Sequence, residues 1–421
     1  MITEYSAEEL KSLLDKLMAE YEKCKALNLK LDMSRGKPSP IQLNINNDLL
    51  GEIDSYITEN GADTRNYGLL DGIPEMKRLF SELLDIEQDK IIIGGNSSLN
   101  LMYDNFMRLY VFGTQGNTPW GRLDNYKFLC PCPGYDRHFA VSEEFGAEMI
   151  NVPMTENGPD MDVVEKLVAE DPTIKGIWCV PLHSNPLGVC YSDETVERLA
   201  SMKTAAPDFR IFWDNAYGVH HIYEDVELAD IFKAAEKYGN EDRIYYFFST
   251  SKITFPGAGV SMVASSKANI AEIKKHMTIQ TIGHDKINQI RHVQYFKTAE
   301  NLKAHMKKHA ASLRPKFDIV LNTLDRELKD TGLATWNPVK GGYFVAVDTY
   351  PGCAKATVAM AKEAGVVMTG AGATYPYKKD PEDKNIRIAP SYPSEEELQQ
   401  AMNLFCLCVK ITGIKKLLEE K

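Results

Sequence analysis

The sequence lacks the features that would direct a protein into a membrane or out of the cell. Among its 421 residues there is no run of about 18 apolar residues, so no membrane-spanning helix is expected. Met1 to Glu20 form a charged, helix-patterned segment without the apolar core of a signal peptide. Positive charge is also in deficit, since the formal net charge is −11 at pH 7. This balance argues against nucleic acid or an anionic membrane surface as the main partner, but it allows a local cationic pocket for a small anion.

The sequence also lacks the short motifs of common metal and nucleotide sites. The two closest cysteine pairs, Cys130/Cys132 and Cys406/Cys408, do not have the two-residue gap of zinc and redox motifs. We therefore expect reduced, buried thiols in a cytoplasmic protein, and no metal. The segment Gly94-Gly95-Asn96-Ser97-Ser98 is not a Walker loop, and its glycine spacing differs from the dinucleotide fingerprint. No repeat and no Gly/Ser-rich linker is present, so lobes packed against each other are expected.

Short apolar segments alternate with amphipathic helical segments through the middle of the chain. Strands are predicted at Ile91–Ile93, Phe128–Cys130, Ile177–Val180, Ile211–Trp213, Tyr245–Phe248 and Met262–Ala264. This alternation predicts an α/β fold with a largely parallel sheet, in which ligands bind where strands end and helices begin. After about residue 315 the pattern changes to that of a smaller α+β lobe. We therefore expect a large domain at 46–315 and a small domain made of 1–45 and 316–421. The capping-box pairs Ser6/Glu9 and Ser394/Glu397 predict the starts of two helices.

Two charged residues emerge at the ends of predicted strands. Lys252 follows Tyr245–Phe248 and precedes a turn rich in glycine and proline. A lysine removed from water loses its proton more easily and becomes nucleophilic, although a surface lysine at a strand end is the common alternative. Asp214 ends the strand Ile211–Trp213, and Tyr217 follows three residues later. Asp214 could hold a ring nitrogen in a pocket or simply cap the next helix.

Two polar turns follow other predicted strands. Asn185 lies in Asn185-Pro186-Leu187-Gly188, which is a tight turn by composition and could present an amide to a ligand. Ser97 and Ser98 lie after two glycines at a predicted helix start, where free backbone N–H groups attract a phosphate. A serine-capped helix after a strand is common, so this segment alone is weak evidence.

The order of these segments is more informative than any one of them. A glycine–serine turn, the aromatic segment Pro131-Cys132-Pro133-Gly134-Tyr135, Asn-Pro-x-Gly, Asp-x-x-Tyr, Ser-x-Ser-Lys and a late arginine, Arg387, occur in succession. In this order the sequence resembles the fold-type I aminotransferases that depend on pyridoxal phosphate (PLP), close to the aspartate aminotransferase branch. The resemblance extends from Ser34 to about Pro393. It includes Asn66-Tyr67-Gly68 and Asp71-Gly72-Ile73-Pro74-Glu75.

The resemblance implies PLP as the cofactor and assigns its contacts by position. Lys252 matches the lysine that forms the Schiff base and moves a proton, and Asp214 matches the carboxylate beside the pyridine nitrogen. Asn185 and Tyr217 match the groups that bond the ring oxygen. The remaining implied contacts are Tyr135 against the ring face, His138 behind Asp214, and Ser97, Ser98, Ser249 and Ser251 at the phosphate. Tyr67 matches a tyrosine that reaches the cofactor of a neighbouring subunit, which implies a homodimer with shared active sites.

The resemblance also implies substrate contacts. Arg387 matches the arginine that binds the substrate α-carboxylate, where planar bidentate geometry requires a guanidinium. Gly36, Asn185 and Lys286 are further expected substrate contacts. For a second substrate carboxylate, Lys286, Arg35 and Arg291 are the candidate cations, although for each of them a solvated surface charge is the more common interpretation. Gly259 stands where the family usually has an arginine for the phosphate, so this chain departs from the pattern there.

The implied function is transfer of an amino group from an L-amino acid, with aspartate or glutamate favoured, to a 2-oxo acid such as 2-oxoglutarate. An aminotransferase of broader or different specificity, or a PLP-dependent lyase or decarboxylase, would present the same cofactor site and stays open. A regulator's effector-sensing domain is disfavoured, because the sequence begins with a short acidic helix and not with a DNA-binding domain.

Overall fold

The computed structural model describes residues 1–421, arranged around one large mixed sheet. In spatial order its strands are β2 (Ile91–Ile93), β9 (Ser261–Ser265), β8 (Ile244–Ser249), β7 (Arg210–Asp214), β6 (Ile174–Cys179), β3 (Lys127–Cys132), β4 (Glu148–Thr155) and β5 (Gly158–Pro159). The five central strands, from β8 to β4, run parallel. β9 is antiparallel to both of its neighbours, and β5 is antiparallel to β4. The predicted α/β fold with a largely parallel sheet is confirmed.

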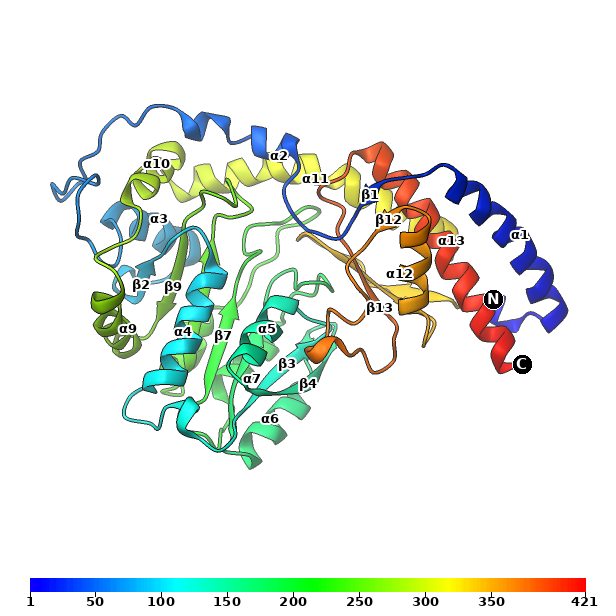
Figure 1. The fold of residues 1–421 in the computed structure, drawn as a ribbon. Coiled ribbons are helices and arrows are strands. Elements are labelled where there is room, and N and C mark those ends of the chain that lie inside the picture. The colour runs from blue at the N-terminus through cyan, green and yellow to red at the C-terminus, as the bar shows by residue number, and fades with distance from the viewer.

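Both faces of this sheet are buried. Successive side chains along a strand point to opposite faces, so every strand except β5 contributes to both apolar clusters. In β7, Ile211 and Trp213 belong to the apolar cluster on one face, while Phe212 belongs to the cluster on the other. Helices cover the two faces (Figure 1). They are α3 (Pro74–Leu84), α4 (Ser98–Phe112), α5 (Asp136–Glu144), α6 (Met161–Glu170), α7 (Asp193–Ser201), α8 (Ile231–Glu236), α9 (Lys267–Gln280) and α10 (Lys286–Phe296). Burial on both faces explains why these strands read as continuous apolar runs in the sequence.

A second, separate apolar cluster joins the two ends of the chain. Its elements are α1 (Ala7–Ala26), α11 (Ala299–Leu328), α12 (Ala354–Glu363), α13 (Glu395–Glu420), the antiparallel sheet β10 (Ala334–Trp336), β11 (Val345–Thr349) and β13 (Asn385–Ile388), and the parallel pair β1 (Leu31–Asp32) and β12 (Val366–Val367). The short helix α2 (Pro40–Asn44) lies against α11. Helices α1 and α13 lie side by side at the end of the molecule away from the large sheet (Figure 1). Both predicted capping boxes are present, at Ser6/Glu9 and at Ser394/Glu397. No helix has the combination of length and apolar character that a membrane crossing would need.

Candidate active site

A cavity of about 290 Å³ lies at the carboxyl ends of β6, β7 and β8, beside the start of α4. Parallel strands bring their carboxyl ends to one edge of a sheet, so residues distant in sequence meet there. Nine of the ten predicted cofactor contacts line this cavity: Ser97, Ser98, Tyr135, Asn185, Asp214, Tyr217, Ser249, Ser251 and Lys252. The tenth, Tyr67, lies outside it.

Lys252 projects into the cavity from the turn after β8. Its Nζ lies 5.0 Å from the centre of the Tyr217 ring and 5.9 Å from that of Tyr343. Loss of hydration in the cavity lowers the pKa of the Lys252 ammonium below its ordinary value, and the negative charge of Asp214 opposes this only in part. The site therefore favours the neutral, nucleophilic amine more than water would.

Asp214 is fixed from behind by His138. The His138 Nε2 lies 2.9 Å from Asp214 Oδ2, and both side chains are buried. The imidazole itself is stacked on the Trp178 ring, with 4.4 Å between ring centres and 9° between ring planes. The other carboxylate oxygen, Oδ1, is buried without a hydrogen-bond partner. Since a buried oxygen without a partner is costly, Asp214 is prepared to accept a hydrogen bond from a ligand.

The two tyrosines that line the cavity stay protonated. Burial raises the pKa of Tyr217 well above its ordinary value, and it raises that of Tyr135 as well. The Tyr217 hydroxyl is therefore a donor in the working pH range. Asn185 is also buried, and its Oδ1 accepts a hydrogen bond of 3.2 Å from Arg387 Nη1.

Hydroxyls and backbone groups surround the serine end of the cavity, which is the end lined by Ser97, Ser98, Ser249 and Ser251. Ser249 Oγ donates to Ser251 Oγ at 3.1 Å, and Ser251 Oγ donates to the Asn96 carbonyl at 3.0 Å. A Cβ atom at Gly259 would lie 3.2 Å from Ser251 N and 3.3 Å from Asn96 O. Glycine at 259 thus lets these two backbone segments pack closely. No arginine lines this cavity, and its one lysine is Lys252.

Arg387 lies next to the cavity, on β13. Its Nη1 donates to Asp136 Oδ1 at 3.0 Å as well as to Asn185, and Nη2 donates to Thr369 Oγ1 at 3.4 Å. The guanidinium lies 4.8 Å above the centre of the Phe344 ring. Its Nε is buried without a partner. The planar group is held from three sides, and its Nε–H is unused.

Of the other predicted substrate contacts, Asn185 lines the cavity, whereas Gly36 and Lys286 do not. Gly36 packs against the ring of Phe344, at a position where a Cβ atom would collide with that ring. Lys286 is buried at the first turn of α10, Arg35 is exposed, and Arg291 is partly buried. Tyr67 is 84% exposed. Within one chain, none of the three candidate cations reaches the cavity lined by Lys252.

Sequence reasoning missed Asp136, Phe344 and Asn96. Asp136 is the first residue of α5, where an acidic residue is ordinary for a helix N-terminus, and this hid its ion pair with Arg387. Phe344 follows Tyr343 and the glycine pair at 341 and 342, and nothing in that segment indicates its contact with Arg387. Asn96 belongs to the glycine–serine turn, and the structure shows that it also lines the cavity.

The comparisons with known proteins agree with this geometry. The family model described as aspartate amino-transferase matches residues 5–421. An aspartate aminotransferase from Corynebacterium glutamicum is 45% identical over 417 residues, which cover 98% of this chain and 96% of that protein. A protein from Mycolicibacterium smegmatis described as a putative aminotransferase is 48% identical over 407 residues, 95% of each chain. The crystal structure of an aspartate transaminase from C. glutamicum superposes with a TM-score of 0.97 at 44% identity and covers 99% of both chains.

Proposed function

The chain belongs to the aspartate amino-transferase family and is an aminotransferase, and we propose that it moves an amino group between L-aspartate or L-glutamate and a 2-oxo acid such as 2-oxoglutarate. The observation that carries the proposal is the buried Asp214 Oδ1, which has no partner and belongs to the same cavity wall as the lysine with the lowered pKa. The aspartate aminotransferase from C. glutamicum supports the choice of amino acid.

The residues of the cavity fit PLP. Lys252 would hold the cofactor covalently, Asp214 would accept a hydrogen bond from its ring nitrogen, and the four serines would surround its phosphate. The orphaned Asp214 oxygen and the hydroxyl-rich wall are the groups that a protonated pyridine and a phosphate require. When bound, PLP supplies an electron sink for the bonds of the substrate α-carbon.

The side chains of this chain perform the proton handling and the positioning. With PLP bound, the Lys252 amine would be the group that takes up and returns the proton at the substrate α-carbon, because its lowered pKa favours the neutral base. The pair of His138 and Asp214 keeps a negative charge fixed at the cavity wall. The protonated Tyr217 and the Asn185 amide act as hydrogen-bond donors to the ring oxygen.

Arg387 orients the substrate through its α-carboxylate. The free Nε and the weakly engaged Nη2 present one edge of the guanidinium, while Nη1 stays on Asp136 and Asn185. Two parallel N–H groups match the geometry of a carboxylate. Gly36 leaves room for the Phe344 ring against which this guanidinium is placed.

A second copy of the chain would complete the site. Tyr67, Ile279 and Ile282 are 84%, 89% and 59% exposed. Gly283 packs against the Gly68 backbone, so these apolar side chains belong to neighbouring segments. His284 Nδ1 would lie 4.0 Å from a Cβ atom at Gly95, which places this exposed face beside the serine end of the cavity. A homodimer through this face would bring the partner subunit's Tyr67 to the phosphate and the partner subunit's Lys286 to a distal substrate carboxylate.

Two broader proposals concern the organisation and location of the protein. We propose a large domain at 46–315 and a small domain of 1–45 with 316–421, supported by one apolar cluster that lies wholly within 46–315 and by a second that is drawn mostly from 1–45 and 316–421. All eight cysteines are free thiols. Their state supports a reducing compartment, which we propose to be the cytoplasm.

The half-reaction with one amino acid tests the function directly. L-aspartate added to the PLP-loaded protein without an acceptor should change the visible absorption of the cofactor and release oxaloacetate in a one-to-one ratio to protein. 2-Oxoglutarate added next should restore the first spectrum and yield glutamate. Release of ammonia or carbon dioxide over many turnovers without an acceptor would contradict the proposal.

A further inference from the structure

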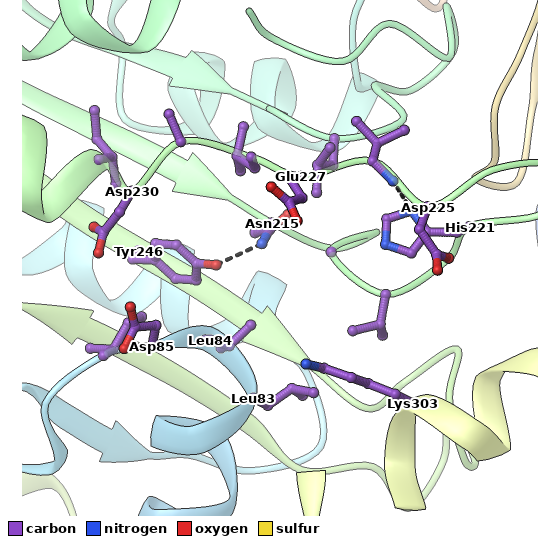
Figure 2. Close-up of a pocket in the computed structure, with 18 of the residues that line it drawn as sticks. Leu83, Leu84, Asp85, Asn215, His221, Asp225, Glu227, Asp230, Tyr246 and Lys303 are labelled. Carbon is purple, nitrogen blue, oxygen red and sulfur yellow. Dashed lines mark hydrogen bonds between the residues drawn. The ribbon is translucent and has the colours of Figure 1, made fainter. Parts of the chain in front are cut away.

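A second cavity lies on the opposite side of the turn that carries Asp214. It has a volume of about 610 Å³ and is bounded by the end of α3, the segment 218–231, and the first turns of α11 (Figure 2). Leu84, Phe232 and Met306 are among its apolar lining. It shares no residue with the cavity around Lys252.

The two cavities use alternate residues of one segment. Asp214, Ala216 and Tyr217 line the cavity around Lys252, while Trp213, Asn215 and Gly218 line the second one. Trp213 and Asp214 end strand β7, where successive side chains point to opposite sides, and the turn after the strand contributes residues to both cavities. An occupant of the second cavity would therefore touch the backbone that carries Asp214.

The floor of the second cavity has unused hydrogen-bonding groups. Asn215 Nδ2 donates to the Tyr246 hydroxyl at 2.6 Å, but Asn215 Oδ1 is buried without a partner. Trp213 Nε1 is also buried without a partner. Asn215 Oδ1 is an unused acceptor and Trp213 Nε1 an unused donor of the lining, and a hydroxyl group donates and accepts at once.

The rim carries charges of both signs that no ion pair neutralises. Asp225 and Glu227 lie on one wall, and Lys303 extends toward the cavity from α11 on the other (Figure 2). These three residues, and Lys307 beside them, form no ion pair with another residue of the chain. By contrast, Asp85 and Asp230 at the far end are both paired with Lys233, at 2.5 and 3.3 Å.

We propose that this cavity binds a free aromatic α-amino acid whose ring ends in a hydroxyl, with L-tyrosine as the type. The α-carboxylate faces Lys303 and Lys307, and the α-ammonium faces Asp225 and Glu227. The ring occupies the apolar body of the cavity, and the phenol reaches Asn215 and Trp213. The site is separate from the substrate position beside Arg387.

Calorimetric titration of the PLP-loaded protein with four compounds tests the chemistry. L-tyrosine binds most tightly. L-phenylalanine lacks the hydroxyl, tyramine the carboxylate and 3-(4-hydroxyphenyl)propionate the ammonium, and each binds about fivefold more weakly or worse. Equal affinity for all four compounds, or no binding of L-tyrosine, overturns the proposal.

Charge variants on the rim locate the binding. Lys303→Glu raises the Kd of L-tyrosine about tenfold, while Lys308→Glu, an exposed lysine on the same helix that does not line the cavity, leaves it unchanged. Neither variant alters the half-reaction with L-aspartate, so a failure of the aminotransferase function is seen separately. If Lys303→Glu has no effect and Arg387→Lys removes the binding, L-tyrosine occupies the substrate position and the second site is wrong.

Discussion

The substitution Arg387→Lys tests the proposed contact between Arg387 and the substrate α-carboxylate. Arg387 keeps its Nη1 on Asp136 and Asn185, and its Nε is buried and free. A lysine at 387 retains the positive charge and can still pair with Asp136. It cannot present two parallel N–H groups to a carboxylate, because its donors radiate from a single nitrogen.

The expected loss follows from the donors that are removed. One charge-assisted hydrogen bond to the substrate contributes about 1.5 to 3 kcal/mol, which corresponds to a decrease of about 10- to 150-fold in kcat/KM. The loss of the packing between the flat guanidinium and the Phe344 ring acts in the same direction. The α-carboxylate is present in both the ground state and the transition state, so much of the change should appear in KM.

The assay is steady-state transamination of L-aspartate with 2-oxoglutarate, with oxaloacetate as the measured product. Arg326→Lys is the matched control, since Arg326 lies on α11 and contacts only Glu327 and Asn403. Its kinetics should equal those of the unmodified protein. A kcat/KM for Arg387→Lys within about threefold of the control would show that Arg387 does not bind the substrate carboxylate.

The remaining predictions concern the lysine, the aspartate, the exposed apolar face and one helix cap. Lys252→Met should abolish turnover and the visible absorption of covalently bound cofactor. In the cofactor-free protein the same change should raise the free energy of unfolding at neutral pH. The unfolded chain holds the Lys252 proton more tightly than the folded chain does, because the pKa of Lys252 is lowered in the folded state. The gain in free energy of unfolding is therefore complete below the folded pKa and vanishes as the pH rises toward 10.5. Urea titrations at several pH values measure this gain, and a gain that grows with pH would refute the argument. Asp214→Asn should keep the contact with His138 but lower kcat by about 100-fold or more, and an unchanged kcat would remove Asp214 from the chemistry. Ile279→Asp should convert a dimer to a monomer in analytical ultracentrifugation, and a dimer that persists would place the interface elsewhere. Ser394→Ala removes the hydroxyl that accepts from the Glu397 N–H at 3.2 Å and should lower the free energy of unfolding by about 1 kcal/mol, which a shift of the urea midpoint would report.

The sequence predicted those parts of the site that depend on one strand and the turn after it. Lys252, Asp214 and Asn185 each follow a buried apolar strand, and parallel pairing alone brings such turns to one edge of the sheet. The predicted strands were found because burial on both faces leaves an uninterrupted apolar run. Strand β4 was missed, because four of its residues are exposed and Pro153 interrupts the pattern.

Contacts between distant segments could not be predicted from the sequence. The ion pair of Asp136 with Arg387 joins residues 251 positions apart. The stacking of His138 on Trp178 depends on the way α5 crosses the sheet. Gly259 was recognised as a departure, but only the packing of its backbone against Ser251 and Asn96 gives a physical reason for a glycine there.

Helix α11 is a single long helix that packs in both apolar cores of the molecule. Its 30 residues extend for about 45 Å. Leu302 and Met306 are embedded in the core beside the large sheet, whereas Leu313 and Phe317 belong to the other core. Pro315, which lies inside the helix, has no N–H to donate to the carbonyl of Ala311. The helix is therefore most easily bent near Pro315, close to the stretch between Met306 and Leu313 where its packing passes from one core to the other. A movement of one core relative to the other would be taken up as bending of α11 close to Pro315.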